Sequence, residues 1–363
     1  MQKNEILVIY GKDIAAMAAR LAQEADLAGL IGDRDKRIGL KPNLAVARPA
    51  SGGATTHPEI AAGLISYLKK NGFDNLVILE GSWAGAFTSN AFTACGYSKL
   101  AGETEVELID TKTDTTKICD CGGMKIEICE SALALDFMIN LPVMKGHCQT
   151  KLTCALKNSK GLIPDREKRR FHGMGLAKPI AHLNTVIRND FIVVDGICGD
   201  LDFEEGGNPL YSGRLFAARD PVLCDAWAAI QMGYAVSEIP YIGLAQKLGV
   251  GSADPGSARV RELNSGKSQS HTAPAPSGKV RQLAVHINED NACSACYASL
   301  VFALSRMNSA ELNRLTEKIC VGQGFQGKQG NIGSGRCTED FEASCPGCPP
   351  SGAAVLAFLR NCL

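Results

Sequence analysis

Two continuous apolar runs constrain the fold of this chain most strongly. They are FMINLPVM at 137–144 and FIVVDGI at 191–197, and neither alternates apolar with polar residues. Such runs are typical of strands buried on both faces, as in parallel sheets that helices cover on each side. Helical patterns separate the runs, so the sequence predicts an α/β fold with a layered, mixed or parallel sheet and helices on both faces.

Shorter apolar runs and helical patterns alternate along the rest of the first 260 residues. The expected strands are 5–10, 38–43, 75–82, 106–111 and the start of 213–233, and the expected helices are 13–29, 56–72, 89–96, 151–159, 176–188 and the end of 213–233. Within 56–72, Thr56 is a candidate N-cap, Pro58 stands in the first turn, and Gly72 follows two lysines. These signals predict a well-delimited helix after the second strand.

A change of composition divides the chain. At 363 residues it exceeds a typical single domain, so a large domain with a smaller module is expected. From residue 264 onward Ser, Pro, Gly and Gln replace apolar residues. The predicted organisation is an α/β domain with a basic anion-binding cleft at 1–263, a linker at 264–286 and an iron–sulfur module at 287–363.

Charge and hydropathy exclude several classes of protein. The chain carries 38 basic and 38 acidic residues, which disfavours nucleic acid and membrane partners. No apolar run approaches the roughly 20 residues of a membrane-spanning helix. The N-terminus has too short an apolar core for a secretory signal, so a cytoplasmic protein is expected.

The sequence lacks three common motifs of enzymes: G-x-G-x-x-G, G-x-x-x-x-G-K-[ST] and G-x-S-x-G. Dinucleotide binding, nucleotide hydrolysis and serine esterase chemistry are therefore unsupported.

The cysteines are unevenly distributed. Seven of the 15 fall in the last 71 residues. In a reducing compartment they are buried thiols, nucleophiles or metal ligands rather than disulfides. Cys293 and Cys296 form one C-x-x-C pair and Cys345 and Cys348 another, a pattern that fits an iron–sulfur cluster or a zinc site. The long gap between the pairs is unlike a compact zinc ribbon and favours iron–sulfur binding.

Several blocks of sequence resemble a known family. IGLKPNL, ATTHPEI, ILEGS, VVDGI, RDPVLCDAWAA and the stretch 139–172 are similar to the signature blocks of the domain of unknown function 362 family. The C-terminal CSACYASL and the glycines that follow resemble a subgroup described as uncharacterised iron–sulfur proteins. That resemblance implies one [4Fe–4S] cluster on Cys293, Cys296, Cys337 and Cys348. Cys345 is a spare thiol, which leaves the fourth ligand open between Cys345 and Cys348.

Positive charge is concentrated at 145–173, which holds eight Lys and Arg and two His against two acids. In open α/β sheets ligands bind where strands end, and basic side chains there attract phosphate or carboxylate. If 148–159 is helical, His147, Lys151 and Cys154 lie near one face. The mixed charges of 165–170 are typical of a solvated loop, and Arg169, Arg170 and His172 are expected in a loop that can fold over the cleft.

Other polar residues end the predicted strands or begin the helices after them. We therefore expect His147, Lys151 and Glu80 as catalytic residues, and as substrate-binding residues Lys41, His57, Lys157, Asn158, Lys160, His172 and Asp195.

These expectations lead to a cytoplasmic iron–sulfur protein of anaerobic metabolism. Its cluster would pass electrons to a small anionic substrate that bears phosphate or carboxylate, or to a redox partner protein. Two alternatives stay open. An iron with only three cysteine ligands would make the protein a lyase or hydratase. A cluster without a small-molecule substrate would make it a non-enzymatic electron-transfer partner.

Overall fold

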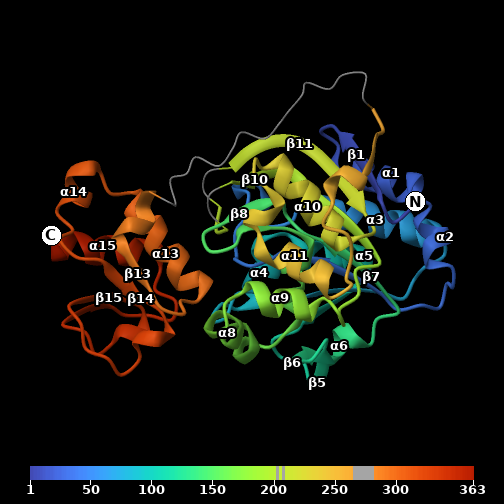
Figure 1. Ribbon diagram of the computed structural model, residues 1–363. Helices are drawn as coiled ribbons and strands as arrows, with labels where there is room; N and C mark the ends of the chain where they lie inside the picture. The colour runs from blue at the N-terminus through green and yellow to red at the C-terminus, as the bar shows by residue number, and fades with distance from the viewer. Residues whose placement is uncertain (202–203, 207–208, 265–281) are drawn as a thin grey trace.

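A mixed eight-stranded sheet forms the centre of the larger part of the molecule (Figure 1). The computed structural model describes residues 1–201, 204–206, 209–264 and 282–363. From edge to edge the strands are β12 (Arg259–Glu262), β1 (Glu5–Tyr10), β11 (Pro209–Ala218), β10 (Phe191–Asp200), β7 (Phe137–Leu141), β2 (Ile38–Pro42), β3 (Leu76–Glu80) and β4 (Glu107–Asp110). β11 is antiparallel to both of its neighbours, and the other pairs are parallel. The predicted mixed α/β sheet is confirmed.

Helices cover both faces of this sheet. One layer contains α1 (Ile14–Glu24), α2 (Leu27–Ile31), α3 (Pro58–Lys70), α4 (Thr88–Ala94) and α5 (Tyr97–Thr104). The other contains α6 (Glu130–Leu133), α7 (Ala155–Asn158), α8 (Asp165–Gly173), α9 (Ala177–Leu183), α10 (Pro221–Gln231) and α11 (Pro240–Lys247). All residues of β7 and β10 are buried, as their continuous apolar runs predict.

A side-chain cap fixes the start of α10, whereas the cap predicted for α3 is not found. The Asp220 carboxylate accepts hydrogen bonds from the backbone N–H groups of Val222 and Leu223 at 2.8 and 2.9 Å and caps α10. The prediction that Thr56 caps α3 is wrong, because the N-cap is His57. The Thr56 hydroxyl instead donates to the Leu141 carbonyl at 2.7 Å and accepts from the Asn43 N–H at 2.8 Å. It therefore joins the ends of β2 and β7.

The basic segment folds differently from its predicted helix and loop. The helix expected over 148–159 is confirmed only in its second part, where 155–158 form α7. Its first part is instead a short hairpin of β8 (Lys145–His147) and β9 (Lys151–Thr153), whose tight turn gives Lys151 a φ of +63°. The loop expected at 165–170 is helix α8, which has Asp165 and Glu167 in its first turn, where the helix dipole favours acids.

The last described segment forms a smaller module with its own core. Its four-stranded parallel sheet consists of β13 (Ile287–Glu289), β14 (Ile319–Val321), β15 (Ile332–Ser334) and β16 (Ala343–Cys345). Helices α13 (Ser294–Ser305), α14 (Ser309–Asn313) and α15 (Gly352–Cys362) accompany it. Most of the expected linker, 265–281, lies outside the described residues. Within the described ranges, no helix has the length and apolar character needed to cross a bilayer.

The module lies against the carboxyl ends of the central strands, beside β8 and α8 (Figure 1). In the turn of the β8–β9 hairpin, Gln149 donates a hydrogen bond to the Ala292 carbonyl at 3.0 Å. Gln323 donates one to the Arg169 carbonyl of α8 at 3.2 Å. Gly85, after β3, touches the Cys348 carbonyl so closely that a Cβ there would lie 2.6 Å from the oxygen. The β8–β9 turn, helix α8 and the loop after β3 thus contact the module.

Candidate functional site

A pocket lies where these two parts of the chain meet, at the carboxyl ends of β2, β3 and β7. It encloses about 820 Å³ of space between protein atoms, part of it open to solvent, which is within the usual range for ligand sites. Its wall combines basic side chains with cysteines. Lining residues are Asn43, Glu80, Trp83, Lys145, Thr153, Lys157, Asn158, Lys160, Lys168, Arg169, His172, Glu204, Cys293, Cys296 and Cys348.

Glu80 lines the pocket and belongs to a buried ion pair with Lys41. The Lys41 ammonium donates to the Glu80 carboxylate at 2.5 Å and to the Pro42 carbonyl at 2.8 Å. Glu80 also accepts the backbone N–H of Gly81 at 2.7 Å. The Asn158 amide lies against the pair and donates to the Lys41 carbonyl at 3.1 Å. Burial lowers the pKa of Lys41, while Glu80 opposes that shift. Lys41 and Glu80 therefore support the pocket, and Glu80 is not a free base.

Two lysines give the pocket its unbalanced positive charge. Within the described parts of the chain, the Lys157 ammonium makes no hydrogen bond or close ion pair, and burial lowers its pKa to about 8 against the opposing attraction of Glu204. Lys160 approaches the His172 Nε2 at 3.4 Å. Burial lowers the pKa of Lys160, and repulsion by Lys157 and Lys168 adds to the effect. An anion bound between these two ammonium groups would relieve the repulsion.

His147 lies beside Glu204, which lines the pocket. Its Nδ1 accepts the backbone N–H groups of Gln149 and Thr150 at 3.1 and 3.2 Å, so the ring proton resides on Nε2. That nitrogen lies 3.2 Å from a carboxylate oxygen of Glu204, which lines the pocket. Burial and the neighbouring Lys157 lower the pKa of His147 well below its ordinary value. The contact with Glu204 lacks hydrogen-bond geometry, so His147 packs against Glu204 and does not itself line the pocket.

Five of the expected site residues do not line the pocket: Lys41, His57, His147, Lys151 and Asp195. Lys151 pairs with Glu238 at 2.7 Å on the surface. His57 Nδ1 lies 2.8 Å from the Asp195 carboxylate, which also accepts the His57 backbone N–H at 2.8 Å. Burial would lower the pKa of His57, but hydrogen bonds to Asp195 and Cys198 raise it to about 10. This pair fixes the start of α3 against β10.

The pocket also contains residues that sequence reasoning passed over. The Lys145 ammonium donates to the Asn43 side chain at 3.0 Å, to the Glu204 carbonyl at 2.9 Å and to the Ala54 carbonyl. Burial lowers its pKa to about 7, with a further contribution from Lys157. Lys168, expected on a solvated loop, is buried and donates to the Gly81 and Ser82 carbonyls. Two features of the sequence could have identified them: Lys145 directly follows the predicted strand at 137–144, and Lys168 lies in the basic stretch 145–173.

The structure brings four cysteines of the module together, and three of them, Cys293, Cys296 and Cys348, line the pocket. Cys293 is the N-cap of α13, Cys296 lies one turn on, Cys337 lies in the short helix η8 (Arg336–Thr338), and Cys348 follows β16. Burial raises the pKa of Cys296, and the thiols of Cys293, Cys348 and Cys337 raise it further. Burial likewise raises the pKa of Cys293 to about 11, with Cys337 and Cys348 adding to the effect.

Cys345 lies apart from these four thiols. It is 2% exposed and packs into the core of the module. Burial raises its pKa, and the only other thiol that contributes is Cys362. Gly335, by contrast, borders the gathered thiols: its φ is +95°, and a Cβ there would lie 3.5 Å from the Cys296 sulfur. Of the two open candidates, Cys348 is therefore the one beside Cys293, Cys296 and Cys337.

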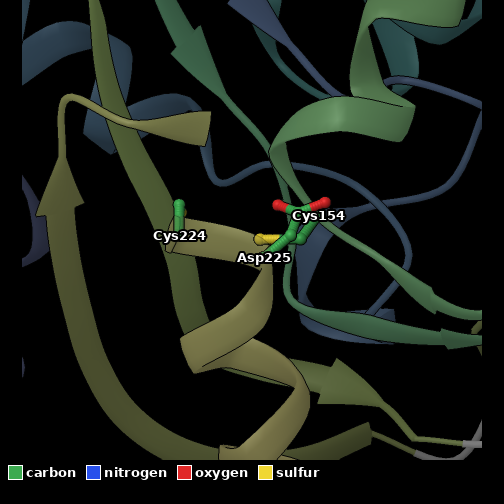
Figure 2. A group of neighbouring side chains, drawn as sticks. All are labelled: Cys154, Cys224 and Asp225. Atoms are coloured by element: carbon green, nitrogen blue, oxygen red, sulfur yellow. The ribbon is translucent and has the colours of Figure 1, made fainter. Parts of the chain in front are cut away.

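A second group of potential ligands, Cys154, Cys224 and Asp225, lies buried where the start of α7 meets α10 (Figure 2). The Asp225 carboxylate accepts the backbone N–H groups of Ala155 and Leu156 at 2.7 and 3.2 Å. It therefore holds the start of α7, the helix that carries Lys157 and Asn158. Burial raises the pKa of Asp225 to about 7, and these hydrogen bonds oppose that shift. We assign the group a structural role because both carboxylate oxygens serve the helix terminus.

Comparison with known proteins identifies the family but no reaction. The chain is 23% identical over 228 residues to the Thylakoid-associated protein sll1697 of Synechocystis sp., an alignment covering 59% of this chain and 68% of that protein. The lactate racemase apoprotein from Thermoanaerobacterium thermosaccharolyticum aligns with a TM-score of 0.42 at 12% identity, over 64% of this chain and 57% of that one. The model of the family described as Domain of unknown function (DUF362) matches residues 38–230, more than half of the chain, which therefore belongs to this family.

Proposed function

We propose that this chain is an iron–sulfur protein whose cluster exchanges electrons with a small anion bound in the basic pocket. One observation carries the proposal: Cys293, Cys296 and Cys348 line the same pocket as Lys157 and Lys160. In this account residues 287–363 form the cluster module and 1–263 the anion-binding domain. The cysteines Cys293, Cys296, Cys337 and Cys348 hold a [4Fe–4S] cluster, and the anion bears a phosphate or carboxylate group.

The spacing of the four thiols supports a cluster over a single zinc ion. Zinc with bonds of about 2.3 Å holds four tetrahedral sulfurs about 3.8 Å apart. Among the described residues, only Cys154, Cys224 and Asp225 form a trio of ligand atoms within 4.8 Å of one another. No three of the module's sulfurs are that close. Wider spacing suits a cluster, because each thiolate then binds a different iron.

The residues of the pocket divide the proposed work. Lys157 and Lys160 bind the anion, Glu204 lines the same pocket, and the buried Lys41–Glu80 pair supports its wall. Lys160 and Arg169 also lower the pKa of Cys293 against the larger effect of burial, so both lie where they can offset thiolate charge. A bound cluster would supply one electron at a time. The anion site therefore adjoins the proposed electron source.

The gathering of four thiols favours electron transfer over lyase or hydratase chemistry. An iron that acts as a Lewis acid needs an open position, which three cysteines would leave. Here Cys348 stands with Cys293, Cys296 and Cys337, so all four irons would have a thiolate available. A purely electron-transferring protein is less well supported, because it would have no use for a buried lysine such as Lys157 that lacks a close partner among the described residues.

Anaerobic purification with iron and sulfide analysis tests the proposal. We expect about four irons and four sulfides per chain and an EPR signal that appears on reduction with dithionite. Zinc in place of iron, or protein that takes up neither metal during anaerobic reconstitution, would contradict it.

Replacing Lys157 with methionine is expected to weaken anion binding by about 10- to 100-fold, since a charged hydrogen bond contributes roughly 1.5–3 kcal/mol. Titration calorimetry with inorganic phosphate and with acetate measures the effect and separates the two anion classes. Because the pKa of Lys157 is about 8, wild-type affinity should be full below pH 7 and fall as the pH rises through 8.

Lys151→Met is the matched control, because Lys151 belongs to the same basic stretch but pairs with Glu238 on the surface. It should bind both anions as the wild type does. Equal losses of anion affinity in the two variants would show a general effect of charge and would contradict the assignment of Lys157 to the anion site.

A further inference from the structure

A glycine-rich loop of the module, GQGFQGKQG at 322–330, runs beside two of the gathered cysteines. The loop is held against the segment that leads into Cys293. Gly324 donates its backbone N–H to the Asp290 carbonyl at 3.0 Å, and Gln323 donates its own to the Asn291 carbonyl at 3.2 Å. Gly322 has a φ of +132°, and a Cβ there would lie 2.0 Å from the Asp290 oxygen. The path of the loop is therefore fixed by close backbone packing.

This fixed loop directs two side-chain amides at sulfur atoms. The Gln326 Nε2 donates to the Cys337 sulfur at 3.5 Å. The Gln323 Nε2 lies 3.7 Å from the Cys293 sulfur and also donates to the Arg169 carbonyl at 3.2 Å. Both glutamines line a groove on the outer side of the thiols, together with Cys293, Cys337 and Cys348. The two N–H groups thus face the thiols from outside, while Lys160 lies in the pocket on the inner side.

We infer that Gln326 and Gln323 raise the reduction potential of the proposed cluster by donating N–H hydrogen bonds to its ligand sulfurs. The inference rests on the proposed function. Reduction adds negative charge to the cluster and its thiolates, so a donor to sulfur stabilises the reduced state more than the oxidised one. Gln326 is a positioning residue for electron transfer. Gln323 has the same role and also joins its loop to α8 by the hydrogen bond to the Arg169 carbonyl.

The test is an EPR-monitored potentiometric titration of the wild type, Gln326→Leu and Gln323→Leu. Leucine keeps most of the side-chain volume and removes the donor, so both variants should show a lower midpoint potential at unchanged iron content. Gln329→Leu is the matched control, because Gln329 is an exposed glutamine of the same loop and should leave the potential unchanged. If Gln326→Leu loses iron, Gln326→Asn supplies the comparison, since its shorter side chain withdraws the N–H from the sulfur.

The outcomes separate this inference from the proposed function. A wild-type protein without iron would overturn both before any variant is made. A wild-type cluster whose potential is the same in Gln326→Leu and Gln323→Leu would overturn the inference alone. A lowered potential in the Gln329 control as well would show a general effect of the loop and also overturn it.

Discussion

Replacement of Cys348 by alanine is expected to abolish the EPR signal of the reduced four-iron cluster and to remove most of the bound iron. The physical reason is the loss of one of four thiolates that the fold brings together. Iron analysis and EPR after anaerobic reconstitution measure the effect, and circular dichroism checks that the variant is folded.

Cys345→Ala provides the control within the same C-P-G-C sequence. Cys345 packs in the core of the module, away from the other thiols. Its replacement should leave the iron content unchanged and cost about 1 kcal/mol of stability for the small cavity. Iron retained in Cys348→Ala but lost in Cys345→Ala would reverse the assignment of the fourth ligand.

Replacement of Lys41 by methionine should lower the free energy of unfolding by about 3–5 kcal/mol, the usual cost of leaving one partner of a buried ion pair alone. The side chains of Lys41 and Glu80 are 0% and 3% exposed. Without the ammonium group, the Glu80 carboxylate keeps only backbone donors. Urea denaturation measures the loss.

Two further variants test whether the loss of stability comes from the buried Lys41–Glu80 pair. Lys41→Met combined with Glu80→Gln removes both charges, so it should recover a large part of the lost stability. Lys99→Met breaks a pair with Glu103 whose side chains are 80% and 62% exposed, and it should change stability by less than about 0.5 kcal/mol. A Lys41→Met protein no less stable than Lys99→Met would show that the wall of the pocket does not depend on this pair.

The fold shows where reasoning from sequence is strong. The apolar run at 137–144 begins with β7, and that at 191–197 begins β10, both buried throughout. Because parallel strands end at one edge of a sheet, the polar residues after β2, β3 and β7 converge, and Glu80, Lys157, Asn158, Lys160 and His172 do line one pocket. Continuous hydrophobicity and strand direction were enough to predict the buried strands and the convergence of these polar residues.

The errors arise where local pattern and tertiary contact disagree. A helix over 148–159 would have placed Lys151 at the anion site together with Lys157. The β8–β9 hairpin instead turns Lys151 toward Glu238. Lys168 belongs to a mixed-charge run that is typical of a solvated surface, yet backbone carbonyls of the loop after β3 bury its ammonium group. Partners far away in sequence decided both positions.

By itself, the sequence determined that the chain forms a mixed α/β sheet, that basic residues collect beyond its strands, and that the C-terminal segment is rich in cysteines. Only the tertiary structure decided that Cys348 rather than Cys345 stands with Cys293, Cys296 and Cys337. It also decided that three of these cysteines, Cys293, Cys296 and Cys348, line one pocket with Lys157 and Lys160. Hydrophobic periodicity is a local property that a strand or helix displays along its own length. The meeting of thiols with ammonium groups more than 130 residues away depends on how two separate cores pack together.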